Sequence, residues 1–221
     1  MYKAYEIFFE NSKKHKEKIE ISLTKNIPSE AGLGGGSSDA GFFLKLLNEH
    51  YGNVYNEKEL EELAMKVGSD VPFFIKNKTA RVGGKGNKIE LVENNLKDSL
   101  ILVKPLGFGV STKDAYNSFD ELDEVRYSNF EKIVECLRND NRKDLEKYIE
   151  NGLEQGISER NADIKMFKAI LNSVVPGKKF FMSGSGSTYY TFVTEIERSQ
   201  IETRLRTFVD NVKIIISKTI N

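Results

Sequence analysis

The sequence is poor in the residues that build disulfides and most metal sites. It has one cysteine, Cys136, and two histidines, His15 and His50, among 221 residues. A single cysteine excludes a disulfide framework within the chain. Both histidines have charged or polar neighbours in the sequence, so we expect neither a histidine metal site nor a Ser-His-Asp triad. We expect Cys136 to be a small buried side chain on one side of a helix.

An excess of charge of one sign and long apolar runs are also absent. Lys+Arg 33 balance Asp+Glu 33, so no net field attracts nucleic acid or an anionic membrane. No apolar run approaches the length of a membrane span, and the first residues lack the pattern of a signal peptide. Because hydrophobic residues make up 39% of the chain, it has enough apolar side chains for an ordinary globular core. We therefore expect a cytoplasmic protein.

Glycine is concentrated in one stretch, "AGLGGGSSDAG", which runs from Ala31 to Gly41. Alternating apolar residues predict a strand over 18–26, and dense apolar residues predict a buried helix over 39–52 with Ser37 or Ser38 as its N-cap. A glycine-rich turn between a strand and a helix is typical of an anion site, because the free amides of the first helical turn point outward and the helix dipole favours negative charge. The alternative is a flexible linker, which fits poorly between segments this apolar.

This run matches neither of the two common phosphate-binding loops. A Walker A loop closes with Lys-Ser or Lys-Thr, whereas Ser37 follows Gly36 here. The dinucleotide-binding fingerprint is only half satisfied by Gly32, Gly34 and Ser37. The local pattern therefore predicts a phosphate loop of another kind.

The remaining segments predict a mixed α+β fold. Asn56 and Glu59 form a capping box at the start of a helix that Gly68 ends. We predict further helices over residues 2–12, 112–119, 129–139, 142–151, 162–174 and 197–209, an apolar strand after the turn at Ser69–Asp70, a hairpin over 79–92, and strands over 99–105 and 212–217.

Three motifs, in order along the chain, resemble one kinase superfamily. They are the glycine run within "KNIPSEAGLGGGSSDA", then "GSDVPFF" (Gly68–Phe74), then "MSGSGST" (Met182–Thr188). They resemble the motifs of the superfamily named for galactokinase, homoserine kinase, mevalonate kinase and phosphomevalonate kinase. The triple glycine followed by "GSDVPFF" and "MSGSGST" resembles specifically the 4-diphosphocytidyl-2-C-methyl-D-erythritol kinases, and "KPLGFGVSTKDAY" and "NGLEQ" resemble further stretches of the same kinases. The resemblance runs through nearly the whole chain.

The resemblance implies a fold, a reaction and cofactors. Such kinases have a two-domain α+β fold, so residues 1–98 would form the ATP- and phosphate-binding amino-terminal domain and residues 99–221 the carboxy-terminal domain. They use ATP and Mg²⁺ to phosphorylate the 2-hydroxyl of a cytidine-diphosphate-linked methylerythritol, in the non-mevalonate route to isoprenoid precursors. The implied partner is this small molecule, and the resemblance implies neither a nucleic acid nor a membrane.

The resemblance also assigns residues to the nucleotide site. The loop that would hold the ATP phosphates with its backbone amides, and the lysine that precedes it, comprise Lys25, Gly32, Leu33, Gly34, Gly35, Gly36, Ser37 and Ser38. The alternative for Lys25 is a plain surface lysine at the end of a strand. Ser37 and Ser38 would contact phosphate or Mg²⁺, or one of them would cap the helix. The ligands of the metal stay unassigned.

Asp70 matches the aspartate that serves such kinases as catalytic base. Phosphoryl transfer needs position, charge neutralisation and a group that receives the hydroxyl proton, and the resemblance gives the last role to Asp70. The alternative is a turn aspartate that follows the helix-ending Gly68. Asp39 would lie in the first helical turn, where an acid interacts well with the helix dipole, so we assign it no catalytic role.

The substrate site is implied at two further places. The turn "MSGSGST" would lie against the phosphates of the substrate, and an aromatic residue would stack on the cytosine base. The matching residues are Thr112, Tyr116, Ser183, Gly184, Ser185 and Gly186. The alternative for Tyr116 is packing on the core face of its helix, and the alternative for the turn is an ordinary Gly-Ser turn.

The sequence departs from the pattern of these kinases in three places. They carry an amino-terminal segment ahead of the position that matches Met1, with a lysine and an asparagine that act near the transferred phosphate. Gly152 replaces a usual acid, and Asn87 replaces a frequent glutamate. We therefore expect an incomplete amino-terminal domain, a compromised substrate site, and a chain or segment that supplies the absent strands. The alternative functions are an inactive nucleotide-binding fragment and another small-molecule kinase of the superfamily.

Overall fold

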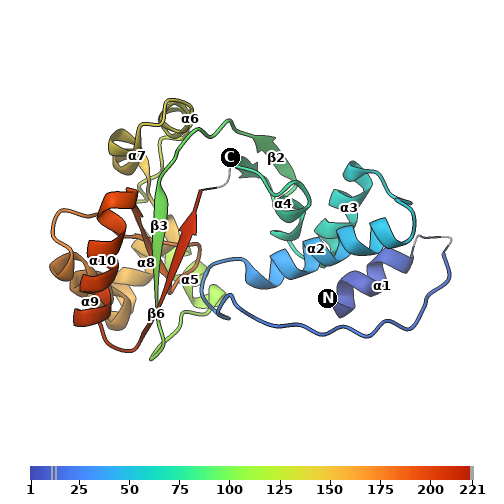
Figure 1. The fold of residues 1–221 in the computed structure, drawn as a ribbon, viewed down its shortest axis with the longest axis horizontal. Helices are drawn as coiled ribbons and strands as arrows, with labels where there is room; N and C mark the ends of the chain where they lie inside the picture. The colour runs from blue at the N-terminus through green and yellow to red at the C-terminus, as the bar shows by residue number, and fades with distance from the viewer. Residues whose placement is uncertain (11, 13, 220–221) are drawn as a thin grey trace. The chain divides into compact units, whose positions relative to one another are not determined.

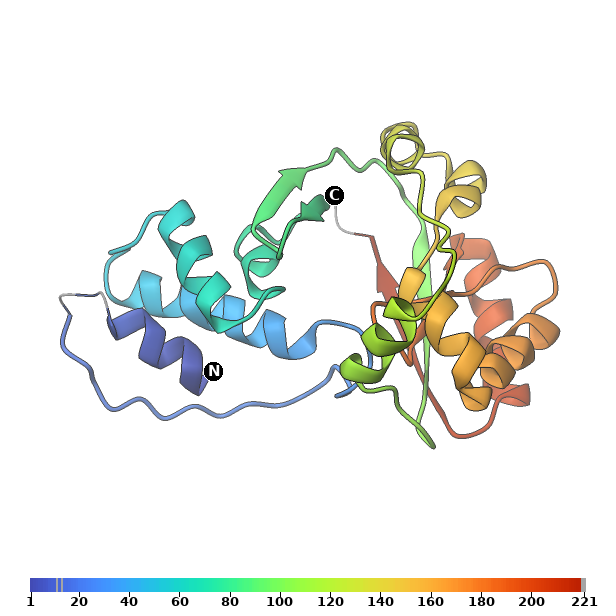
Figure 2. The same cartoon turned by 180° about the vertical axis from the view of Figure 1, so that it is seen from behind.

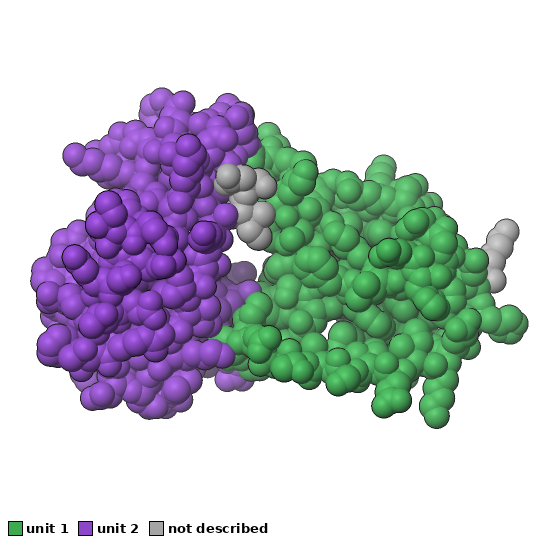
Figure 3. Space-filling model, viewed as in Figure 1, with its two compact units in different colours: residues 1–29, 34–92 green, residues 30–33, 93–221 purple. Residues whose placement is uncertain are grey.

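The computed structural model describes residues 1–10, 12 and 14–219. The chain forms two compact units, coloured separately in Figure 3: unit 1 comprises residues 1–29 and 34–92, and unit 2 comprises residues 30–33 and 93–221. The glycine run is therefore shared in sequence between the units, because Gly32 belongs to unit 2 and Gly34 begins the second part of unit 1.

Unit 1 is a small helical unit with one hairpin (Figure 1). Its elements are α1 (Tyr2–Glu10), α2 (Gly35–His50), α3 (Glu57–Val67), α4 (Val71–Lys76), β1 (Ala80–Gly83) and β2 (Lys88–Leu91). Its core packs buried residues of all four of these helices together, including Phe8, Leu44 and Leu63. The antiparallel pairing of β1 with β2 confirms the predicted hairpin. The predicted helix over 2–12 is confirmed as α1, and residue 11 of that prediction lies outside the described residues.

The ends of α3 agree with the sequence prediction. The Asn56 side chain accepts the N–H of Glu59, the Glu59 carboxylate accepts the N–H of Asn56, and Gly68 lies at the C-cap. This reciprocal pairing satisfies two amides that the helix itself leaves without partners. The prediction succeeded because every group involved lies within four residues along the chain.

The predicted strand over residues 18–26 was wrong. The segment is extended but belongs to no strand, and Figures 1 and 2 show it as a long connection between α1 and α2. Its alternating side chains stay partly in solvent, with Ile19, Ile21 and Leu23 exposed by 37%, 42% and 48%. An alternating pattern makes a strand only where a neighbouring strand accepts and donates its backbone hydrogen bonds.

The segment after Ser69–Asp70 was also predicted wrongly, because it forms the helix α4 rather than a strand. Pro72 lies in the first turn of this helix, where its missing N–H costs nothing. Val71 and Ile75 are one helical turn apart and both are buried. A short apolar run fits a buried helix as well as a strand, so periodicity could not decide between them.

Unit 2 is built on an antiparallel sheet with the strand order β4-β5-β3-β6. Its strands are β3 (Ser99–Pro105), β4 (Phe181–Met182), β5 (Tyr189–Val193) and β6 (Val212–Lys218). The central strand β3 places Ile101 opposite Thr191 of β5 and Ile216 of β6. The predicted strands over 99–105 and 212–217 are thus confirmed.

Helices of unit 2 cover both faces of this sheet. They are α5 (Thr112–Asp120), α6 (Phe130–Arg138), α7 (Arg142–Tyr148), α8 (Gly152–Arg160), α9 (Ala162–Val174) and α10 (Glu195–Phe208). Ile101 and Val103 of β3 pack with residues of α8, α9 and α10, whereas Leu100 packs in a second cluster with residues of α6 and α7. Cys136 is buried in that second cluster, as expected.

Helix α8 was not predicted from the sequence, although its neighbours were. Its side chains include two glycines and several charged residues, so its apolar periodicity is weak. Gly152 and Gly156 serve close packing, because a Cβ at either position would lie within 2.6 Å of an atom of Phe119 or Ser118. No helix in the described part of the chain is long and apolar enough to cross a membrane.

Candidate functional site

The N-terminus of α2 is formed by the glycine run. Gly34 occupies the N-cap position with φ 63°, in the left-handed region that favours glycine. The N–H of Ser38 donates to the carbonyl of Gly34, at 2.8 Å, and closes the first helical turn. The amides of Gly35, Gly36 and Ser37 precede this bond, so they lack partners within the helix. This end of α2 therefore offers free N–H groups and the positive end of a helix dipole.

The prediction that Ser37 or Ser38 caps α2 was wrong. The helix begins at Gly35, no side chain caps it, and both serines lie inside its first turns. The Ser38 hydroxyl instead donates to the carbonyl of Gly35, at 2.9 Å. Gly34 adopts the left-handed conformation at the N-cap, so the helix already begins at Gly35. The two serines therefore lie inside the helix and not at its cap.

The glycines of the run differ in what surrounds them. A Cβ at Gly34 would lie 3.0 Å from the Phe74 ring, and a Cβ at Gly35 would lie 3.0 Å from Ile27. A Cβ at Gly36 would meet no atom within 4 Å. Protein packing therefore explains the first two glycines and leaves the third unexplained. An anionic ligand that lies close to the backbone of a helix N-terminus would leave no room for a Cβ there, which would explain a glycine at this position.

Lys25 and Asp39 form an ion pair beside this helix end. The Lys25 ammonium lies 3.8 Å from the position of a Cβ on Gly35. Lys25 therefore adds a positive charge next to the free amides, on the same side as Gly35. Asp39 lies on α2, and its ion pair with Lys25 holds the lysine near the helix end.

Asp70 lies at the N-cap position of α4 and its carboxylate is not used to cap that helix. The carboxylate accepts a long hydrogen bond from the neighbouring Ser69 hydroxyl, at 3.5 Å, and the residue is exposed. The hairpin turn fixes the backbone here, because a Cβ on Gly86, which has φ 93°, would lie 1.9 Å from the Ser69 carbonyl oxygen. The carboxylate is thus accessible to a ligand and makes no hydrogen bond that caps α4.

In unit 2, Gly32 packs against the loop that connects β4 and β5, residues 183–188. The Ser183 hydroxyl donates to the Gly32 carbonyl, at 2.9 Å. A Cβ on Gly32 would lie 2.0 Å from the Ser183 carbonyl oxygen, and the residue has φ 67°. Only glycine fits this position. The first part of the glycine run and the "MSGSGST" motif are therefore packed together, as two segments far apart in the sequence.

The loop over 183–188, called the glycine–serine loop below, is held by α8 and α5. The Asn151 side chain, which caps α8, donates to the carbonyls of Met182 and Gly184 at 2.8 and 2.9 Å. Thr112 and Ser185 share a hydrogen bond of 3.2 Å between their hydroxyl oxygens. The structure thus brings two of the predicted substrate residues, Thr112 and Ser185, into contact.

Tyr116 lies on the exposed side of α5. Its side chain is 54% exposed, whereas the preceding Ala115 is fully buried. The alternative that Tyr116 packs on the core face of its helix is therefore wrong. An exposed tyrosine ring one turn after Thr112 is free to stack on a planar ligand.

Lys104, Asn151 and Ser187 contact these loops. Each lies in a motif named above, "KPLGFGVSTKDAY", "NGLEQ" or "MSGSGST", but none was assigned a role from the sequence. Lys104 is a charged residue that follows the apolar run of β3, and Asn151 precedes a helix in the way that N-cap residues do. The first signal, a charged residue directly after an apolar run, was visible in the sequence. The motif "MSGSGST" includes Ser187, but the sequence did not predict that this serine is buried, because its burial depends on segments distant along the chain.

No cluster of three or more His, Cys, Asp or Glu side chains suited to a metal ion is present in the part of the chain that the structure describes. A divalent ion at the α2 terminus would therefore depend on hydroxyl groups, on a single carboxylate and on oxygens of the ligand itself.

Comparisons with known proteins agree on one family. The profile "GHMP kinases N terminal domain" matches residues 1–78. The 4-diphosphocytidyl-2-C-methyl-D-erythritol kinase of Fusobacterium nucleatum subsp. nucleatum is 77% identical over 221 residues, which are 100% of this chain and 75% of that protein. The protein of the same name from Clostridium botulinum (strain Loch Maree / Type A3) is 35% identical over 206 residues, covering 90% of this chain and 70% of that protein.

A solved structure gives the same result for the fold. The crystal structure of a 4-(cytidine 5'-diphospho)-2C-methyl-D-erythritol kinase matches with a TM-score of 0.71 and 27% sequence identity. The match covers 89% of this chain and 69% of that one. The α+β fold predicted from the sequence is therefore confirmed as the fold of this kinase superfamily.

Proposed function

The chain belongs to the 4-diphosphocytidyl-2-C-methyl-D-erythritol kinase family of the GHMP kinases, and we propose from this membership and from the α2 terminus how it performs the family's reaction. The reaction is ATP-dependent phosphorylation of 4-diphosphocytidyl-2-C-methyl-D-erythritol, in the non-mevalonate route to isoprenoid precursors. The observation that carries the proposal is the helix end at Gly36, where a Cβ would meet no atom within 4 Å.

The nucleotide site consists of the glycine run and its lysine. The free amides of Gly35, Gly36 and Ser37 donate to phosphate oxygens of ATP, and Lys25 adds a positive charge beside them. Gly32, Leu33 and Gly34 give the backbone its course into the helix. These groups suit a chain of phosphates, because backbone N–H groups and an ammonium donate hydrogen bonds to negatively charged oxygens, whereas carboxylates would repel them.

Mg²⁺ completes this site in the proposal. Ser37 and Ser38 carry hydroxyl groups in the first turns of α2, and Asp39, whose carboxylate pairs with Lys25, follows directly. These are hard oxygen ligands, which suit Mg²⁺. When bound, the ion neutralises charge on the transferred phosphoryl group.

Asp70 is the catalytic base of the proposal. Its exposed carboxylate accepts the proton of the substrate hydroxyl as that oxygen attacks the γ-phosphorus, and the bond to the β-phosphate oxygen breaks to release ADP. The turn around Gly86 packs against the Ser69 carbonyl, which positions the backbone before Asp70.

The substrate site of the proposal lies in unit 2. The glycine–serine loop, through Ser183, Gly184, Ser185 and Gly186, binds the diphosphate of the substrate, and Thr112 orients the loop. Tyr116 stacks on the cytosine base. This assigns ATP and phosphate binding to residues 1–98 and the remaining functions to residues 99–221. A cytoplasmic location stays a prediction.

The experiment that tests this function is a comparison of phosphate acceptors. The purified chain is incubated with Mg-ATP and either 4-diphosphocytidyl-2-C-methyl-D-erythritol, homoserine or mevalonate, and ADP and the phosphorylated product are measured. We expect product with the first acceptor alone. Product with homoserine or mevalonate would identify another kinase of the superfamily, and bound ATP without product would identify an inactive nucleotide-binding protein.

A further inference from the structure

Lys104 is a buried lysine near the end of the central strand β3. The residue is 6% exposed, and its neighbours Val103 and Pro105 are buried as well. A lysine this deeply buried normally pairs with a carboxylate, because burying a charge is expensive. The Lys104 ammonium instead donates to two neutral oxygens, the Ser187 hydroxyl at 2.6 Å and the Phe108 carbonyl at 3.2 Å.

Those two acceptors belong to different loops. Phe108 lies in the connection between β3 and α5, and Ser187 lies in the glycine–serine loop with its side chain fully buried. The Ser187 hydroxyl also reaches the Phe108 carbonyl, at 3.4 Å. One ammonium group thus ties together the loop that leads into α5, where Thr112 lies, and the loop that carries Ser185.

The glycine–serine loop needs such an anchor. Gly184 and Gly186 have φ 53° and 84°, and glycine gives a loop more conformational freedom than any other residue. The carbonyl of Gly184 is fixed by Asn151 at one end of the loop, and Ser187 is fixed by Lys104 at the other. With both ends fixed, the backbone amides between them keep one arrangement.

We propose that Lys104 is a positioning residue that acts through Ser187 to hold the glycine–serine loop in the form that binds the diphosphate of the substrate. Lys104 does not touch the substrate. The inference rests on the proposed function for the identity of the ligand, and it adds a residue to which no role was assigned by the sequence.

A purely structural role for Lys104 predicts a different result from a positioning role. Burial lowers the pKa of the Lys104 ammonium, and the nearby Glu30 carboxylate offsets this only in part, so the charge is costly to the folded state. Replacing a buried charge by an apolar side chain of similar length is often neutral or stabilising. We therefore expect Lys104→Met to melt at the same temperature as the wild-type chain or higher, while the loop becomes more mobile.

The test compares Lys104→Met and Ser187→Ala with a control, Lys178→Met. Lys178 is a suitable control because it is also largely buried in unit 2, where it pairs with Glu197 at 2.8 Å and donates to the carbonyl of Phe192 at 3.2 Å. Its loss therefore disturbs unit 2 without removing a contact to either loop. Amide hydrogen exchange of residues 183–188 is measured without ligand. We expect exchange at least about tenfold faster in Lys104→Met and Ser187→Ala and unchanged in Lys178→Met.

Steady-state kinetics then connects the loop to the substrate. In Lys104→Met the KM for 4-diphosphocytidyl-2-C-methyl-D-erythritol should rise about tenfold or more, with the KM for ATP changed by less than about threefold. The double variant Lys104→Met/Ser187→Ala should be no worse than either single variant, because both break the same contact.

Unchanged loop exchange in Lys104→Met, or additive effects in the double variant, would overturn the inference. Equal rises of both KM values would also contradict it, because they would indicate a general disturbance of unit 2. A wild-type chain that does not bind this substrate would refute the proposed function instead, and the exchange data would still decide whether Lys104 fixes the loop.

Discussion

At the scale of single residues, the glycines of the run have separable reasons to be glycine. Gly32 is required by the protein itself, because a Cβ there would lie 2.0 Å from a carbonyl oxygen. Gly36 is not, because its Cβ would meet no atom within 4 Å. We infer that Gly36 is a glycine because of the ligand. Substitution of Gly32 should therefore change stability, and substitution of Gly36 should change ATP binding.

We expect Gly36→Ala to fold normally and lose ATP affinity. Alanine inside a helix should raise the free energy of unfolding by up to about 1 kcal/mol, while the added methyl group should weaken binding of a non-hydrolysable ATP analogue about tenfold or more. Gly32→Ala should instead lower the free energy of unfolding by more than about 2 kcal/mol. Urea denaturation and equilibrium titration measure both quantities. Wild-type ATP affinity in Gly36→Ala would show that no phosphate approaches this backbone.

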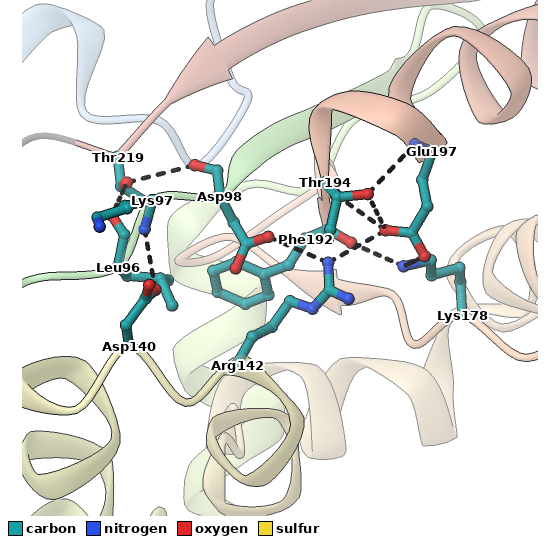
Figure 4. Close-up of polar contacts among 10 residues, drawn as sticks. All are labelled: Leu96, Lys97, Asp98, Asp140, Arg142, Lys178, Phe192, Thr194, Glu197 and Thr219. Atoms are coloured by element: carbon teal, nitrogen blue, oxygen red, sulfur yellow. Dashed lines mark hydrogen bonds and ion pairs between the residues drawn. The ribbon is translucent and has the colours of Figure 1, made fainter.

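At the scale of elements, a network of charges connects α7, α10 and the start of β3 (Figure 4). Arg142 of α7 donates to Asp98 and to Glu197 of α10, both at 3.1 Å. Lys178 lies 2.8 Å from the other oxygen of Glu197, and the Glu197 carboxylate also accepts the N–H of Thr194 in a capping box. Burial alone would raise the pKa of Glu197, but Lys178 and the Thr194 N–H lower it, to about 2.

This network should weaken in acid. Because the pKa of Glu197 is lower in the folded chain than its ordinary value of 4.5, the folded state is stabilised above pH 4.5, and that contribution is lost as pH falls toward about 2. Solvent screens this partly exposed group, so we expect Glu197→Gln to lower the free energy of unfolding by about 1–2 kcal/mol near neutral pH and by much less near pH 2.5. Denaturant unfolding across this pH range measures the difference.

Glu195→Gln is the matched control, because Glu195 lies on the same helix with its side chain 65% exposed and pairs with Arg198 at the surface. Its effect should be below about 0.5 kcal/mol at every pH. If Glu197→Gln lowers the free energy of unfolding by the same amount at neutral pH and at pH 2.5, the charge of Glu197 does not contribute to stability.

Elements also show what the sequence could and could not predict. The caps of α3 at Asn56 and Gly68 and the hairpin were predicted correctly, because their hydrogen bonds join residues close in the chain. The cap of α2 was predicted wrongly, because the helix begins at Gly35, before the two serines. The strand over 18–26 was wrong because a strand needs a partner that the local pattern does not reveal. The helix α4 was mistaken for a strand because a run of five apolar residues, Val71 to Ile75, fits either form.

At the scale of the whole molecule, the family and the fold could be predicted from three motifs in order, and the comparisons confirmed both. The contacts that arrange the site could not be predicted in the same way. Gly32 meets Ser183, and Lys104 meets Ser187, across long stretches of sequence. Such contacts depend on how the sheet of unit 2 brings its loops to one end, which local patterns do not specify.

The central claim is that this chain is a kinase whose base is Asp70. The most direct measurement is ADP release with Mg-ATP and 4-diphosphocytidyl-2-C-methyl-D-erythritol, for the wild-type chain, for Asp70→Asn and for the control Asp163→Asn. Asp70 is exposed and does not cap its helix, so both variants should melt like the wild-type chain. Asp163 is an exposed residue of α9 that has no role in the proposed site.

The account predicts substrate-dependent ADP release by the wild-type chain and by Asp163→Asn. In Asp70→Asn the kcat should fall about 100- to 10,000-fold, with the KM for ATP nearly unchanged. A variant Asp70→Asn that keeps more than about a tenth of the wild-type kcat would contradict the role of Asp70. Absence of substrate-dependent ADP release from the folded, ATP-bound wild-type chain would contradict the kinase itself.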